Sequence, residues 1–295
     1  MRPLPAVDGL DPCRVLLPEG PWRQLGEFLL QQFPQVAEQV WRERLLTGRA
    51  VGRNGDPLEW TQRYPPGTEL YYHRELPDEP QVPFEAEILY RDADLLVADK
   101  PHFLPVVPAG RFLRETLLVR LRQETGLAEL TPVHRLDRLT AGLVLFSCRP
   151  ESRGAYTDLF RQRKIRKVYQ ALAPLDPQQA WPQVRRSRIV AGQPFFRMTE
   201  VEGLGNAETR IDLLEQRGSA GLYSLEPLSG RKHQLRLHMA GLGLAIHGDP
   251  LYPNLQPQPE ADDFAAPLQL LAAALAFEDP LTGQPRRFES RRQLG

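Results

Sequence analysis

Within this 295-residue chain, the segment that most constrains the fold and the chemistry is His134–Gly142, with the sequence HRLDRLTAG. It leads straight into the apolar residues Leu143–Phe146 (LVLF), which are typical of a buried strand. The turn therefore places the carboxylate of Asp137 at the mouth of a strand, flanked by Arg135, Arg138 and His134. An aspartate among cations stays ionised, and an ionised, partly desolvated carboxylate can act as a nucleophile. The alternative is that Asp137 only holds the loop through ion pairs.

The composition, 41% hydrophobic and 25% charged, is that of a globular protein with room for one large and one small domain. No apolar run is long enough to span a bilayer, and the N-terminus lacks the pattern of a signal peptide. The two cysteines, Cys13 and Cys148, indicate neither a disulfide framework nor a metal site. We therefore expect a cytoplasmic protein without membrane contact, metal or cofactor.

The charge is balanced overall, with 37 basic and 37 acidic residues, so the sum alone does not indicate a nucleic-acid partner. The basic residues are nevertheless clustered, at Arg161–Lys167 (RQRKIRK), Arg185–Arg188 and Arg231–Lys232. Nearly all of them are arginines, which make planar, bidentate contacts to phosphate. Because an arginine bias also arises from genome composition, it carries little weight by itself.

Turn residues and hydrophobic periodicity divide the chain into two parts, residues 1–80 and 81–295. In the first part we expect an extended tail over residues 1–19 and helices over Pro21–Phe33 and Val36–Leu46. A strand with an Asn-Gly hairpin turn over Ala50–Gly55, a strand at Glu69–His73 and a linker over Pro77–Pro83 should follow.

The second part alternates strand and helix patterns. We expect strands at Ile88–Tyr90, Leu95–Lys100, Leu143–Phe146, Val168–Leu172, Thr209–Leu214, Leu222–Leu228 and Leu268–Phe277, and helices at Thr116–Gln123 and Glu151–Arg163. A further helix, capped by Ser229 and ended by Gly241, carries His233 and Arg236 on one face.

HRLDRLTAG resembles the active-site motif of the RluA family of RNA pseudouridine synthases, and Asp137 falls on the catalytic aspartate of that family. Other family motifs are similar in order and spacing to LLVADKP, RKVYQALA, LSGRKHQLRLHMAGLG and IHGDPLY. The chain departs from the family pattern at His102–Pro105, at Ser229 in place of threonine and at Leu271 in place of histidine. Leu271 is therefore expected to have a packing role.

The resemblance covers about residues 86–290 and implies an α+β fold around a large mixed, mainly antiparallel sheet with a central cleft. The two helices and hairpin of residues 1–80 resemble the small RNA-binding module that precedes many bacterial members. The alternative for this module is a packing appendage that contacts no RNA.

Three site residues follow from the resemblance: Asp137 as the nucleophile, Tyr169 stacked against uracil and Arg236 paired with Asp137. Arg135 matches an arginine that fills the gap left by a flipped base. His233 and His238 are expected to be structural. The expected RNA-contacting residues are Arg135, Lys100, Arg138, Arg163, Lys164, Arg166, Lys167 and Arg231.

The resemblance implies a monomeric isomerase that converts specific uridines in structured RNA to pseudouridine, with ribosomal RNA favoured over transfer RNA because of the extra module. Whether Asp137 attacks the sugar or the base is open. One rival is a catalytically inactive RNA-binding or chaperone protein, although the set Asp137, Tyr169 and Arg236 is intact. Another is a glycoside hydrolase, which would need a second carboxylate that no motif supplies.

Overall fold

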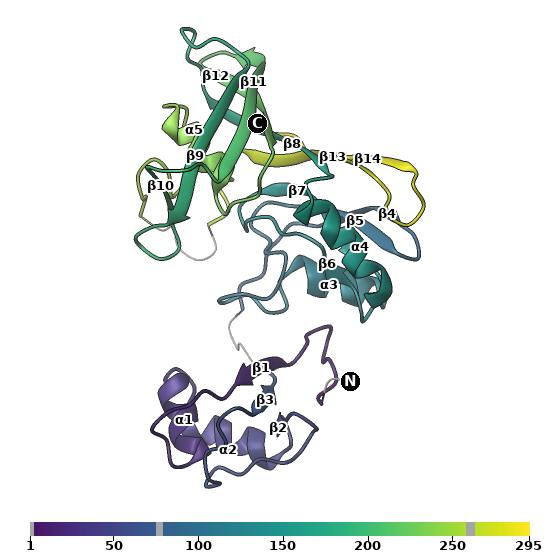
Figure 1. The fold of residues 1–295 in the computed structure, drawn as a ribbon, viewed down its shortest axis with the longest axis vertical. Helices are drawn as coiled ribbons and strands as arrows, with labels where there is room; N and C mark the ends of the chain where they lie inside the picture. Colours follow the sequence, from purple (N-terminus) through teal and green to yellow (C-terminus); the bar gives the residue numbers. More distant parts are fainter. Residues whose placement is uncertain (1–2, 75–78, 258–262) are drawn as a thin grey trace. The chain divides into compact units, whose positions relative to one another are not determined.

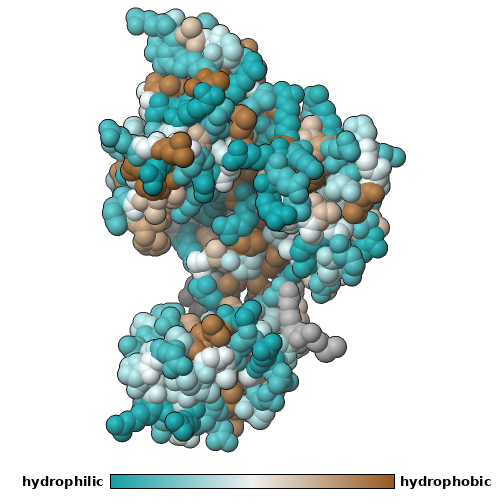
Figure 2. Space-filling view, viewed as in Figure 1, coloured by the Kyte–Doolittle hydropathy of each residue, from teal (hydrophilic) through white to brown (hydrophobic). Residues whose placement is uncertain are grey.

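The computed structural model describes residues 3–74, 79–257 and 263–295. The chain forms two compact units, residues 1–79 and 80–295, so the division falls beside the expected one at residue 80 (Figure 1). The visible face of each unit is mainly hydrophilic, with apolar residues in small separate groups (Figure 2). Within the described ranges, no helix combines the length and the apolar character needed to cross a membrane.

The N-terminal unit packs two helices against a small sheet in the order β1-β3-β2. Its tail is not wholly extended coil as expected, because Cys13–Leu16 forms β1, which pairs antiparallel with β3. Only four residues alternate inward and outward there, too few for a recognisable pattern. The other elements agree with expectation: α1 (Leu25–Gln32), α2 (Glu38–Leu46), β2 (Ala50–Gly52) and β3 (Glu69–Tyr72).

In the described residues, the second unit is built on one sheet of eleven strands. Its main path runs β10-β9-β11-β12-β8-β13-β7-β5-β4, and all pairings are antiparallel except that between β13 and β7. This confirms the expected α+β fold with a mixed, mainly antiparallel sheet. The strands are β4 (Glu87–Arg91), β5 (Leu95–Lys100), β6 (Thr131–Pro132), β7 (Ala141–Ser147), β8 (Arg166–Pro174), β9 (Gln183–Ala191), β10 (Met198–Val201), β11 (Ala207–Arg217), β12 (Ala220–Pro227), β13 (Leu270–Glu278) and β14 (Pro285–Glu289).

Strands β5 and β7 are buried on both faces, which explains their continuous apolar sequences. On one face, Val144 and Phe146 pack against α3 (Leu117–Thr125). On the other, Leu143 and Leu145 pack with residues of α4 (Pro150–Arg161). The loop that carries Asp137 therefore leads into a strand that is buried on both faces.

Strands β8, β11 and β12 instead have one face covered by α5 (Gln234–Gly241). Alternate residues of β8, among them Ala171 and Ala173, pack under this helix, while Val168 and Gln170 lie on the opposite face. Because side chains alternate along a strand, this pattern decides which residues of β8 can reach a site beside α5.

Three expectations need correction, one about the linker and two about the ends of α5. The expected linker residue Val82 is buried and its N–H donates to the Glu115 carboxylate at 2.8 Å, so this part packs on the second unit; positions 77 and 78 lie outside the described residues. Ser229 does not cap α5, because its hydroxyl donates to the Gln234 side chain and the helix begins at Gln234. Gly243, at φ +79°, provides the left-handed residue after the helix that we expected of Gly241.

Gly142 is required where β7 passes β13. Its φ is +109°, and a Cβ there would lie 2.3 Å from the carbonyl oxygen of Ala272. We expect Gly142→Ala to lower the free energy of unfolding by about 3 kcal/mol, since both the backbone and the neighbouring strand would have to move. A Cβ added at Gly154 of α4 would meet no other atom within 4 Å, so Gly154→Ala should be neutral or stabilising by about 0.5–1 kcal/mol. Denaturant unfolding of both variants makes the comparison; equal stabilities would contradict it.

Candidate active site

Asp137 lies in the loop between β6 and β7, where the N–H of Thr140 donates to its carbonyl oxygen at 3.1 Å and closes a turn. Its carboxylate is one-third exposed. His134 of the same motif points away from it: its Nε2 accepts from the N–H of Leu145, and its ring stacks on Phe160 at 4.4 Å. Burial lowers the pKa of His134 to about 3, so it is a neutral packing residue and not a charge beside Asp137.

Arg236 of α5 faces Asp137, as expected, but its hydrogen bonds go elsewhere. Its Nη1 lies 3.5 Å from Asp137 Oδ2, whereas Nε and Nη2 donate to the two oxygens of Asp249 at 2.7 and 2.6 Å. Burial disfavours the charge of this guanidinium, but the bonds to Asp249 and the charge of Asp137 outweigh it and raise its pKa. The expected Arg236–Asp137 pair is therefore one side of a three-residue cluster.

His233, which we expected to be structural, also faces the carboxylate. Its Nε2 lies 3.7 Å from Asp137 Oδ2, and its Nδ1 shares a hydrogen bond of 2.9 Å with the Tyr252 hydroxyl. Burial lowers the pKa of His233 to about 4, against the attraction of Asp137. The imidazole is therefore neutral at neutral pH.

Tyr169 and Lys167 of β8 line the same cavity of about 280 Å³ as Asp137 and Arg236. Burial and the charge of Asp137 raise the pKa of Tyr169, so its hydroxyl stays protonated at neutral pH. Lys167 donates to the carbonyl oxygen of Ser229 at 3.0 Å. Burial and the charge of Arg163 lower its pKa to about 8, so the side chain is still mostly protonated at neutral pH and loses its charge just above it.

The expected RNA-contacting residues divide by position. Arg135 and Arg231 are exposed at the rim of the 280 Å³ cavity. Arg138 lines a second hollow on the other side of Asp137, with its guanidinium 5.5 Å from the Phe112 ring. Arg163 and Lys164 are exposed in the turn between α4 and β8.

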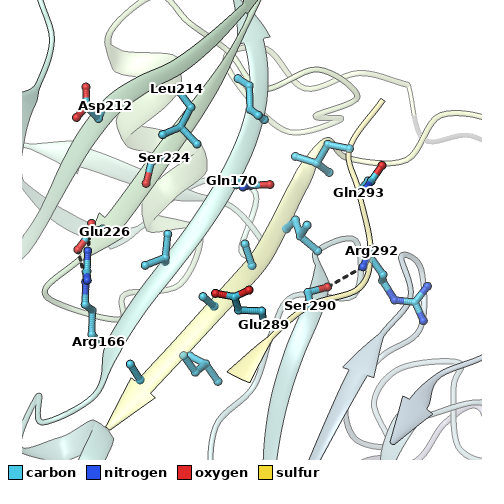
Figure 3. Close-up of a pocket in the computed structure, with 18 of the residues that line it drawn as sticks. Arg166, Gln170, Asp212, Leu214, Ser224, Glu226, Glu289, Ser290, Arg292 and Gln293 are labelled. Carbon is cyan, nitrogen blue, oxygen red and sulfur yellow. Dashed lines mark hydrogen bonds and ion pairs between the residues drawn. The ribbon is translucent and has the colours of Figure 1, made fainter. Parts of the chain in front are cut away.

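Two of these residues lie where an RNA contact at this cavity is not possible. Lys100 is fully buried and donates to the carbonyl oxygens of Pro101 and Arg138, and burial lowers its pKa. Its hydrogen bond to Arg138 connects β5 to the loop that carries Asp137. Arg166 projects from β8 on the face opposite Tyr169, where it pairs with both oxygens of Glu226 in a separate hollow (Figure 3).

Asp249 and Tyr252, in the loop after α5, are the site residues that sequence reasoning missed. Both belong to the motif IHGDPLY, but no role followed from it. The signal was available in one form: an arginine on the apolar side of a helix requires a buried carboxylate, and Asp249 is the next acidic residue along the chain.

The arrangement suits a nucleophilic carboxylate beside a flat ligand. Asp137 faces a fixed cation and a neutral imidazole, and a protonated tyrosine forms part of the same cavity. Within the part of the chain that the structure describes, no group of three or more histidine, cysteine or acidic side chains is arranged to hold a metal ion.

The sequence and the fold of the chain are similar to those of known proteins. Residues 94–241 match the family model described as RNA pseudouridylate synthase. An uncharacterised RNA pseudouridine synthase of Synechocystis is 30% identical over 77% of the chain and 78% of its own length, and the dual-specificity RNA pseudouridine synthase RluA of Haemophilus influenzae is 31% identical over 70% and 92%. A solved structure of human RNA pseudouridylate synthase domain containing 4 is similar, with a TM-score of 0.54, 26% identity and coverage of 70% of this chain and 88% of that one. Relatives from human, mouse and yeast are longer, and the chain spans only 32–40% of their length.

The lowered pKa of Lys167 predicts a pH-dependent interaction with phosphate. A phosphate prefers the charged amine, so RNA binding above the pKa must take up a proton, and the dissociation constant should rise up to roughly tenfold between about pH 7 and pH 9. Lys167→Arg keeps its charge at both pH values and should remove this dependence. Lys164→Arg, at an exposed lysine nearby, is the matched control and should behave as wild type. Fluorescence anisotropy at constant ionic strength measures the effect; a wild-type pH dependence in Lys167→Arg would refute the assignment.

Proposed function

Because the chain belongs to the RNA pseudouridylate synthase family, we propose that it isomerises specific uridines in structured RNA to pseudouridine, with Asp137 as the nucleophile. As a member of this family it is an RNA pseudouridine synthase, an isomerase that acts on RNA. The nucleophile, the flipped base and the choice of RNA are the finer parts of the proposal.

The convergence of Asp137, Tyr169 and Arg236 in one cavity carries the proposal. They come from a loop, a strand and a helix that are far apart in sequence. Among the described residues that line this cavity, Asp137 is the sole carboxylate. Asp249 is buried behind Arg236 and bonded to it, so it cannot serve as the second carboxylate of a glycoside hydrolase.

The reaction breaks the bond between C1′ of the ribose and N1 of uracil and forms one between C1′ and C5. The proton leaves C5 and N1 gains one, so no water, donor or electron is consumed. In the proposed mechanism Asp137 attacks the sugar or the base, and Arg236 Nη1 stabilises its charge from 3.5 Å. Tyr169 stacks against the uracil and presents a protonated hydroxyl.

The target uridine must leave its helix to reach this cavity. The exposed Arg135 at the rim is placed to enter the gap, since a flat guanidinium can stack between bases. Arg231 and the exposed pair Arg163 and Lys164 would then hold neighbouring phosphates, with the usual dependence on salt.

Ribosomal RNA is the favoured substrate and transfer RNA the second, because the N-terminal unit resembles an additional RNA-binding module. The proposal includes action in the cytoplasm as a monomer. A catalytically inactive RNA-binding protein is less well supported, since the cavity keeps all three residues of the proposed mechanism, Asp137, Arg236 and Tyr169. Mapping pseudouridines in RNA from cells with and without the protein identifies the target.

Asp137→Asn should abolish pseudouridine formation while RNA affinity stays within about threefold of wild type, because an amide keeps the shape of the side chain but cannot attack. Tritium release from RNA labelled at C5 of uridine reports the reaction. Asp212→Asn, on the opposite face of the sheet, is the control and should remain active. If Asp137→Asn turns over within a few-fold of wild type, Asp137 is not the nucleophile.

Removal of residues 1–79 should weaken RNA binding more than it slows the bound chemical step, because Asp137, Tyr169 and Arg236 all belong to the second unit. Single-turnover rates at saturating enzyme, with RNA affinities measured in parallel, separate the two effects. A truncated protein that binds RNA normally but reacts much more slowly would contradict this division of roles.

A further inference from the structure

Asp249 is a buried carboxylate with unusually complete hydrogen bonding. Its side chain is 1% exposed, and it accepts from Arg236 Nε and Nη2 and from the N–H groups of Leu251 and Tyr252, at 2.6–3.1 Å. A carboxylate with four donors in a buried position has no free side for a ligand. Its contribution to the site must therefore act through the residues that it holds.

The first of these is Arg236. Because the guanidinium is planar and two of its nitrogens are bonded to Asp249, the direction of the third is fixed. That third nitrogen, Nη1, is the one that faces Asp137 Oδ2 at 3.5 Å. Without Asp249, a buried guanidinium would turn toward the remaining carboxylate and form a closer pair with Asp137.

The second route leads through Tyr252. Asp249 Oδ1 accepts from the backbone N–H of Tyr252, whose ring lies 5.3 Å from the Arg236 guanidinium. The Tyr252 hydroxyl is in turn hydrogen-bonded to His233 Nδ1 at 2.9 Å, which turns Nε2 toward Asp137 at 3.7 Å. Asp249 is thus connected to both groups of α5 that face Asp137.

We propose that Asp249 is the positioning residue of this site: it holds Arg236 and, through Tyr252, His233, so that both face the Asp137 carboxylate without closing on it. The inference rests on the proposed function, because it concerns the geometry of the proposed nucleophile. The other groups acting on Asp137, the buried amino group of Lys100 on β5 and the hydroxyl of Tyr169 on β8, have no bond to Asp249.

Asp249→Asn tests the proposal, because the amide keeps the shape but loses the charge and one acceptor. We expect its single-turnover rate to fall roughly 100-fold through misplacement of Arg236, with RNA affinity nearly unchanged. Asp279→Asn is the matched control. Like Asp249, Asp279 has a side chain that is 1% exposed and accepts from an arginine and from two backbone N–H groups. It accepts in addition from a tyrosine hydroxyl, and it lies at the far end of β13. Equal rates for the two variants would overturn the proposal.

The pH–rate profile separates positioning from general damage. In Arg236→Ala, Asp137 loses its cation, so the acid limb of the profile should move to higher pH. In Asp249→Asn, Arg236 keeps its charge and loses its other carboxylate, so the limb should move to lower pH. Damage to the fold would lower the rate of both variants without moving their acid limbs in opposite directions. Acid limbs that move in the same direction in Arg236→Ala and Asp249→Asn would overturn the proposal.

Two further measurements keep the test decisive if Asp249→Asn does not fold. Asp249→Glu retains the charge and should recover part of the rate, and Tyr252→Phe should slow the reaction by roughly tenfold or less through the loss of the hydroxyl that holds His233. Wild-type rates in both would overturn the proposal.

An NMR readout does not depend on activity. The Arg236 Nε–H signal should exchange slowly in wild type and in Asp137→Asn, and rapidly in Asp249→Asn. If the wild type forms no pseudouridine, the proposed function fails, yet this signal still tests Asp249. A slowly exchanging signal in Asp249→Asn would overturn the positioning role.

Discussion

The site depends on keeping a guanidinium charge where water hardly reaches it. Arg236 is 3% exposed, and such a charge is tolerated only when well-aligned carboxylates compensate for its lost hydration. The structure supplies two unequal partners. Asp249 is buried and forms two hydrogen bonds with the guanidinium, whereas Asp137 is one-third exposed and lies 3.5 Å from it. This inequality leaves the carboxylate of Asp137 largely free of hydrogen bonds to Arg236. An equal sharing of Arg236 would compensate for the buried charge as well but would leave less of the Asp137 carboxylate free.

Much of the fold could be predicted because the burial of each strand is visible in its sequence. The runs LLVA of β5 and LVLF of β7 are continuous because helices cover both faces, and the alternation in β8, β11 and β12 reflects a single covered face. Strand β1 was missed because four residues at the edge of a small sheet carry too little pattern. The caps of α5 were misplaced because serine and glycine at plausible spacing serve other purposes there.

Asp137, Tyr169 and Arg236, which motif order grouped, line one cavity in the structure, but their hydrogen bonds were not predicted. Asp249 was missed as the main partner of Arg236 because no role followed from its motif, although it is the next acidic residue along the chain. Residue type alone was also misleading: Lys100 is a basic residue, yet its amino group is buried and donates to two backbone carbonyl oxygens. Whether a cation lies at the surface or below it depends on tertiary packing, which a local sequence pattern does not record.

The alternation along β8 also constrains how this enzyme can change its length over evolution. Tyr169 and Lys167 face the cavity, while Arg166 and Gln170 face the opposite hollow. Since a shift of one residue exchanges the two faces of a strand, a single insertion or deletion in β8 would turn Tyr169 out of the cavity. Length variation should therefore collect in the connections, such as the turn at Gly218 between β11 and β12, where an added residue leaves both faces in place.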